Sequence, residues 1–194
     1  MADVTRSAIS AEALADEFWA FSLALYGRPE VAAACLRLQD AHGLDVNLLL
    51  LCCFLARSGR GRLSAAALAA AEARIAPWRA SVLTPLREAR RALKTMNAPG
   101  APALYAEVKR IELAAEREAQ RLLLASWLAP PAVSSDRAAD EAANLALYFA
   151  AQSLPSETAD ELTNVLPSMG CHGPMRWICQ PPDSGLRFTV PVHL

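Results

Sequence analysis

The sequence predicts an all-α protein, a single compact multi-helix domain of about seven or eight helices with a Pro/Gly-rich C-terminal tail. Hydrophobic residues make up 54% of the 194 residues but aromatic residues only 6%, so most apolar positions hold Ala or Leu. Both are strong helix formers, and small side chains let helices approach closely. Apolar residues also recur at helical spacing as far as residue 166, and no convincing strand precedes residue 167.

The first third of the chain predicts three helices, each bounded by residues that favour helix ends. Ser10 can cap the first helix, and Pro29 suits the first turn of the second. Gly43 favours the left-handed conformation that ends a helix, and Asp45 can cap the third helix. The third helix is apolar all round, so it should be the most buried segment of the protein. The expected spans are 11–26, 29–42 and 46–58.

The rest of the helical region predicts five more helices. Ser64 can cap an alanine-rich helix that ends near Pro77, and Thr84-Pro85 can open a basic helix that runs to Met96. The run 97–102 contains two prolines and a glycine, which predicts a break between helices. The remaining expected spans are the longest helix at 103–128, a helix from Ser135 or Asp136 to 154, and a short one at 156–166.

We expect the helical domain to occupy residues 1–166 and an irregular tail or small β-hairpin to occupy residues 167–194. The tail holds 5 of the 13 prolines and 3 of the 8 glycines, which disfavour a helix. Two weakly alternating runs within it leave a hairpin possible, but an isolated hairpin is marginal without a surface to pack on.

Composition and charge favour a cytoplasmic protein with no membrane span. The first 18 residues lack the apolar core of a signal peptide, and the longest apolar run is nine residues, against the roughly 20 that cross a bilayer. The net charge of −1 is segregated: residues 59–121 carry +6, between flanks of −3 and −4. This basic middle either neutralises the acidic ends within the fold or presents a basic face to an anionic partner.

The segment Gln39 to Asn47 is the first candidate site, because polar residues gather there between two apolar helices. Gln39, Asp40, Asp45 and Asn47 are its candidate ligand-binding residues. The structural interpretation is a hydrogen-bonded joint between helices, sealed by aromatic side chains. A joint that opens into a pocket would instead hold a ligand or a catalytic centre.

A basic ridge is the second candidate site. The spacing of Arg87, Arg90, Arg91 and Lys94 places all four on one helix face. The ridge is either a solvated or internally ion-paired face, or a grip for a phosphate or an acidic partner. If one of the three arginines reaches Asp40 or Asp45, the two candidate sites become one.

Several kinds of site are not indicated, and we expect no cofactor. Cys171, His172 and Cys179 lack zinc-site spacing, so no metal site is predicted. No cysteine has an evident His or Asp partner, and no nucleophile motif is present, so an enzyme is not favoured. Nucleic-acid binding is not expected without interleaved aromatics and a high positive charge. Three cysteines in apolar helical runs should be buried, reduced and unreactive: Cys35, Cys52 and Cys53.

Two blocks near the N-terminus carry a resemblance to a known family. They read FWxFSxxLY, beginning at Phe18, and CLxLQDxxGxDVNLLL, beginning at Cys35; Trp78 and the run from Pro85 to Arg91 add to them. With these blocks, residues 15–165 resemble a proteobacterial helical family catalogued as domain-of-unknown-function family 2390. The resemblance implies a short, soluble, helical bacterial protein and no particular activity.

Two functional interpretations stay open. The first, which we favour, is a non-enzymatic protein-interaction or adaptor module that binds a protein partner or self-associates through the long helix at 103–128. The second is a small-molecule binding protein or enzyme for an anionic ligand, with its site formed by the Gln39–Asn47 segment and the arginine ridge. The absence of an assembled base, nucleophile or metal set favours the first.

Overall fold

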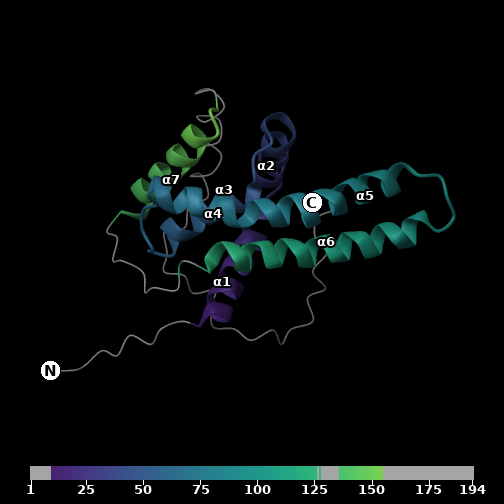
Figure 1. Cartoon of the computed structure of the whole chain (residues 1–194), viewed down its shortest axis with the longest axis horizontal. Coiled ribbons are helices and arrows are strands. Elements are labelled where there is room, and N and C mark those ends of the chain that lie inside the picture. The colour runs from purple at the N-terminus through teal and green to yellow at the C-terminus, as the bar shows by residue number, and fades with distance from the viewer. Residues whose placement is uncertain (1–9, 126, 128–135, 155–194) are drawn as a thin grey trace. The chain divides into compact units, whose positions relative to one another are not determined.

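The computed structural model describes residues 10–125, 127 and 136–154, and this part of the chain is all helical (Figure 1). No strand occurs in it, which confirms the predicted fold class. The expected helix at 156–166 and the tail at 167–194 lie outside the described residues. The helices are α1 (Ala11–Tyr26), α2 (Pro29–His42), α3 (Val46–Arg57), α4 (Ala65–Trp78), the π-helix η1 (Arg79–Leu83), α5 (Thr84–Thr95), α6 (Ala101–Leu124) and α7 (Arg137–Ala151).

The chain divides into two compact units, each discontinuous in sequence. Unit 1 comprises Met1–Asp16 and Leu63–Pro131, and unit 2 comprises Glu17–Arg62 and Ala132–Leu194. Unit 1 therefore holds α4, η1, α5 and α6, and unit 2 holds α2, α3 and α7. The chain leaves unit 2 after α3 and returns to it for α7.

Unit 2 is built around α3. Every side chain of α3 from Val46 to Ala56 is buried, as the all-round apolar pattern predicted. Its Phe54 ring stacks on the Phe18 ring of α1, with the ring centroids 4.9 Å apart, and α7 packs along α3. The predicted ends of α2 and α3 are confirmed: Gly43 takes the left-handed conformation with φ of 65°, and Asp45 caps α3.

Unit 1 contains one long helix, from Ala65 to Thr95, where two were expected. Pro77 lies inside α4, and the π-helix η1 joins α4 to α5 without a break. Thr84 is helical and does not cap α5; its N–H bonds the Arg79 carbonyl five residues earlier. Proline lacks an N–H and crowds the carbonyl four residues before it, and the wider π turn accommodates this at Pro85. The predicted interruption between Pro77 and Thr84 was therefore wrong.

The long helix α6 begins at Ala101, two residues before its predicted start, and ends at Leu124. Pro102 lies in its first turn, where a missing N–H costs no helical hydrogen bond. The apolar residues along this helix are only partly buried. Ala115 is buried, but Leu104 is 57% exposed and Ile111 is 45% exposed.

In the described residues, no helix is long and apolar enough to cross a membrane.

Candidate functional site

The Gln39–Asn47 segment is a tightly bonded joint between α2 and α3. The Gly43 N–H donates to the Gln39 carbonyl at 3.0 Å and closes α2. The Asp45 carboxylate accepts from the Asn47 N–H at 2.8 Å and from the Leu48 N–H at 3.3 Å, which satisfies two donors at the α3 N-terminus. Asp45 is only 7% exposed, so its carboxylate serves as a helix cap, as predicted.

Tyr148 of α7 seals this joint. The Asp45 N–H donates to the Tyr148 hydroxyl at 2.9 Å, and the same hydroxyl donates to the Asp45 carbonyl at 3.0 Å. Both bonds are buried, and they span 103 positions of sequence. The seal is therefore a tyrosine from a helix that the sequence did not connect with the joint.

The other three candidates in the joint differ in accessibility. Asn47 lies in the first turn of α3 and is 4% exposed, Gln39 is half-buried, and Asp40 is exposed on the last turns of α2. Each of Asp40 and Asn47 has a polar interaction within the protein. Among the four candidates, Asp45 is thus the one whose side chain caps α3 within the joint.

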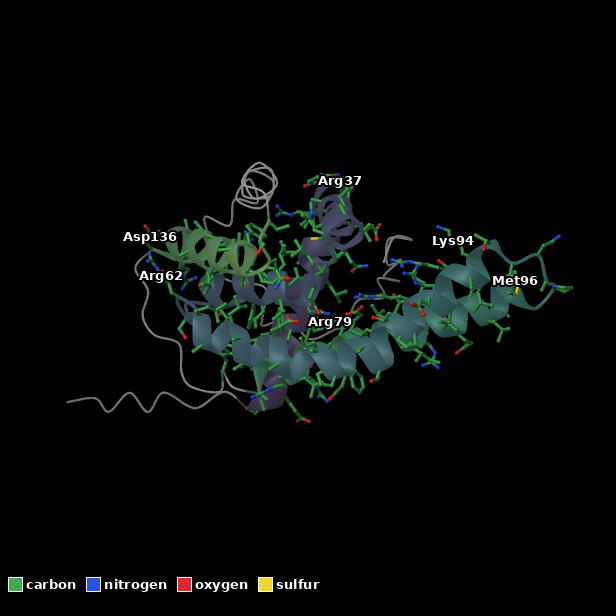
Figure 2. The ribbon with its side chains drawn as sticks, turned by 45° about the horizontal axis from the view of Figure 1, so that its top comes forward. Arg37, Arg62, Arg79, Lys94, Met96 and Asp136 are labelled. Atoms are coloured by element: carbon green, nitrogen blue, oxygen red, sulfur yellow. The ribbon has the colours of Figure 1, made fainter. Side chains whose placement is uncertain are left out.

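A row of polar side chains on α7 holds unit 2 together and was missed by sequence reasoning. The buried Asn144 amide donates to the Cys52 carbonyl at 3.1 Å and to the Gly61 carbonyl at 3.2 Å. Asp140 accepts from Arg62 at 2.8 Å (Figure 2 labels Arg62). Asp140, Asn144 and Tyr148 recur every four residues on a helix otherwise rich in Ala, and this spacing was the available signal.

Arginines from the end of α3 take part in the same polar layer of unit 2. Arg57 forms a bidentate pair with Glu141, at 2.8 Å and 2.6 Å. The Arg60 guanidinium lies over the Phe54 ring, and its Nη2 is 4.0 Å from the Glu17 Oε2. Burial lowers the pKa of Arg60, and the Arg60 Nε has no hydrogen-bond partner among the described residues. Cations at a helix C-terminus also interact favourably with the helix dipole, so this cluster stabilises the end of α3.

The predicted arginine ridge lies on α5, and two of its members pair with α6. Arg87 donates to Glu116 at 2.6 Å, and Arg90 donates to Glu112 at 2.5 Å. The four side chains are between 7% and 18% exposed, so these pairs are largely shielded from water. Arg91 is exposed. The internally ion-paired interpretation therefore holds for Arg87 and Arg90, while a bond from the ridge to Asp40 or Asp45 stays a prediction.

An apolar face lies beside these ion pairs on the arm formed by α5 and the first half of α6, residues 84–112. On α5, apolar residues directly precede Arg87, Arg90 and Lys94; on α6, one directly precedes Glu112. Two antiparallel helices are related by a two-fold axis perpendicular to the plane that contains both helix axes. Residues that directly precede the facing residues therefore lie on the same side of the helix pair, whichever of the two helices they belong to. We call this side the apolar face; its residues are Leu86, Ala89, Leu93, Leu104, Val108 and Ile111.

Three cysteines are buried, as predicted. Cys35, Cys52 and Cys53 carry free thiols and are at most 1% exposed. Burial raises the pKa of Cys35 from 9.0 to about 11 and that of Cys52 to about 12. Burial, followed by the nearby Glu141, raises the pKa of Cys53 well above its ordinary value. The thiolate form needed for nucleophilic chemistry is thus disfavoured at neutral pH.

No group of three His, Cys, Asp or Glu side chains suited to a metal ion occurs in the described residues.

Residues 17–123 match the family described as Protein of unknown function (DUF2390), which is more than half of the chain. The chain belongs to the DUF2390 family. The match spans α2 to η1, α5 and nearly all of α6, and ends before α7. The N-terminal blocks and the arginine run that carried the resemblance lie within it, although the resemblance was expected to extend to residue 165. Comparison with curated proteins and with solved structures finds no match.

Proposed function

We propose that this DUF2390 protein is a non-enzymatic interaction module of the cytoplasm and that the apolar face of its arm binds an amphipathic helix of a partner protein. The observation that carries the proposal is the location of exposed large apolar side chains. Four are found in the described residues, and three of them, Met96, Leu104 and Ile111, belong to the arm. Figure 2 shows Met96 at the end of the arm, beside Lys94.

The geometry of the face suits a helix as its occupant. Leu104, Val108 and Ile111 follow one another at steps of four and three residues, the spacing at which side chains of one helix fit between those of another. Two antiparallel helices also leave a groove between them, and a third helix laid there buries apolar residues from both. Leu86 and Leu93 would form the α5 side of this groove and are half-buried.

Length supports a single helix over a second copy of the same arm. α5 has 12 residues, so the two-helix part of the face is about 18 Å long at 1.5 Å per residue. The face spans two helices whose axes lie about 10 Å apart, so its area is about 400 Å² at most. A stable complex typically buries roughly 800 Å² on each partner. A short helix that contributes further contacts beyond the arm fits this area better than two small faces alone.

The alternative, an anionic-ligand site at Gln39–Asn47 and the arginine ridge, has less support. Asp45 caps a helix, and Arg87 and Arg90 already hold carboxylates, so a ligand would have to displace intramolecular bonds. The buried cysteines with raised pKa values also supply no nucleophile for catalysis.

Site-specific photocrosslinking in the native host tests the proposal. A benzoylphenylalanine at Leu104 should crosslink to one protein, and mass spectrometry should place the crosslink in an amphipathic helix of that protein. Ala106 is the matched control: it is exposed on the same helix but lies about 200° further round it. Equal crosslinking from both positions would contradict the proposal, and crosslinks to a second copy would replace the partner with self-association.

Charge substitution then tests the face quantitatively. Leu104→Glu combined with Ile111→Glu should weaken binding of the crosslinked partner by at least about tenfold, because both changes bury a carboxylate in an apolar groove. Leu23→Glu is the control, since Leu23 is a large apolar residue 38% exposed on α1. Unchanged affinity of the double variant, with its helicity intact, would exclude the apolar face as the binding surface.

A further inference from the structure

The continuous helix formed by α4, η1 and α5 changes its mode of packing at the π-helix η1. On the α4 and η1 side, the buried residues are apolar: Leu68, Ala71, Ile75 and Leu83. The Trp78 indole adds a hydrogen bond to the Ala115 carbonyl of α6 at 3.1 Å. On the α5 side, no residue is buried, although α5 lies along α6 throughout its length (Figure 1). The two halves of one continuous helix are therefore held to α6 by different forces.

No apolar side chain of α5 is fully buried, and two ion pairs join this helix to α6. Arg87 bonds Glu116 and Arg90 bonds Glu112, so the attachment is electrostatic and specific in direction. Glu112 belongs to the buried face of α6 and is 6% exposed. Loss of Arg90 would remove the cation that Glu112 contacts in this shielded position, so the Arg90–Glu112 pair favours the state in which α5 lies against α6.

The junction between the two halves is suited to a change of direction. η1 is a π turn in which hydrogen bonds run over five residues, and Pro77 and Pro85 flank it. Neither proline can donate a backbone hydrogen bond, so the helix has fewer bonds here than elsewhere. π turns and prolines are the usual sites of helix bending.

We propose that α5 is a hinged flap: η1 is its hinge, and the Arg87–Glu116 and Arg90–Glu112 pairs hold it closed. In the open state α5 separates from α6, and α4 stays packed. Opening exposes Glu112 and Glu116 on α6 and Arg87 and Arg90 on α5, which gives the protein two separate charged helix surfaces. Ionic strength and charged partners then set the balance between the two states. This inference does not depend on what the apolar face binds.

Hydrogen exchange of the full chain, followed by mass spectrometry, tests the flap. A helix of 12 residues is marginal in water by itself, so α5 should lose its amide protection when it separates from α6. Raising NaCl from about 0.1 M to about 1 M shortens the screening length from about 10 Å to about 3 Å. Because salt stabilises the charges that opening exposes to water, this change should speed α5 exchange about three- to tenfold. Exchange in α4 should not change, and the boundary should fall within η1.

Paired substitutions identify the force involved. Arg90→Met with Glu112→Met replaces one pair by apolar side chains and should reduce the salt response of α5 by about half, since one of two pairs remains. Arg110→Met with Glu107→Met is the matched control, because that pair lies on the same arm but is mostly exposed, at 70% and 64%; it should leave the salt response unchanged. The single change Arg90→Met should speed α5 exchange at low salt, because Glu112 is left unpaired.

Three results would overturn the proposal. The first is α5 exchange as slow as α4 exchange at both salt concentrations. The second is protection that rises evenly from Thr95 into α4, with no step at η1. The third is a salt response of α5 exchange that is abolished when the exposed control pair is replaced but not when the Arg90–Glu112 pair is replaced.

Discussion

Removal of the Tyr148 hydroxyl should destabilise unit 2 more than its size suggests. In Tyr148→Phe, the Asp45 N–H loses its bond and becomes a buried unsatisfied donor, which costs about 1–3 kcal/mol. The Asp45 carbonyl loses one partner but still accepts from the Leu49 N–H at 3.2 Å, so that loss costs only about 0.5–1.5 kcal/mol. Together they predict a decrease of about 2–4 kcal/mol in the free energy of unfolding.

Urea unfolding followed by circular dichroism measures this effect. With a urea dependence of about 2 kcal/mol per M, the midpoint should fall by about 1–2 M. Thr95→Val is the control, because it also removes a hydroxyl, but one whose bond to the Ala92 carbonyl is exposed. Its effect should stay within about 0.5 kcal/mol. Equal midpoints for Tyr148→Phe and Thr95→Val would refute the conclusion that the hydroxyl seals the joint.

Three further predictions concern unit 2. Asn144→Leu should lower the free energy of unfolding by about 1–3 kcal/mol, measured by urea unfolding, because the Cys52 and Gly61 carbonyls lose a buried donor. Gly59→Ala should cost about 1–2 kcal/mol in the same assay, because Gly59 has a φ of 77°. Burial raises the pKa of Cys35 to about 11 and that of Cys52 to about 12, so these thiols ionise at lower pH in the unfolded chain than in the folded one. The free energy of unfolding should therefore be unaffected by them below pH 9 and should fall as the pH rises through the two raised pKa values. A stability profile that is flat from pH 8 to pH 11, or rapid thiol labelling of Cys52 at neutral pH, would contradict this.

Helix ends were predictable from the sequence because short-range chemistry determines them. Gly43, Asp45 and Ser64 act within three or four residues of their own position, and each takes the role that its type predicts. The burial of α3 was predictable for a similar reason, since a helix that is apolar on every side has no polar face to expose. These features need no knowledge of which helices pack together.

The partners of polar side chains were not predictable, because they depend on how distant helices meet. The ridge of Arg87 and Arg90 was correctly placed on one helix face, but its carboxylates come from α6, 29 and 22 positions away. Asp45 was correctly expected to cap α3, but the tyrosine that covers it lies 103 positions away. Spacing within one helix shows which side chains share a face, but it does not show which other helix supplies their hydrogen-bond or ion-pair partners.

The region between Pro77 and Pro85 shows how a local rule fails when the backbone has another way to satisfy it. Pro77 and, seven residues later, the Thr84-Pro85 pair predict a helix end and a new start. The chain forms a π turn instead, and this keeps α5 continuous with a helix that is anchored by apolar contacts. α5 needs that continuity, because a basic helix of 12 residues without a buried side chain has little to hold it in place by itself. The π turn that keeps α5 continuous with α4 is also the place where the helix can bend. The two prolines beside it therefore support both the length of the arm and its proposed movement.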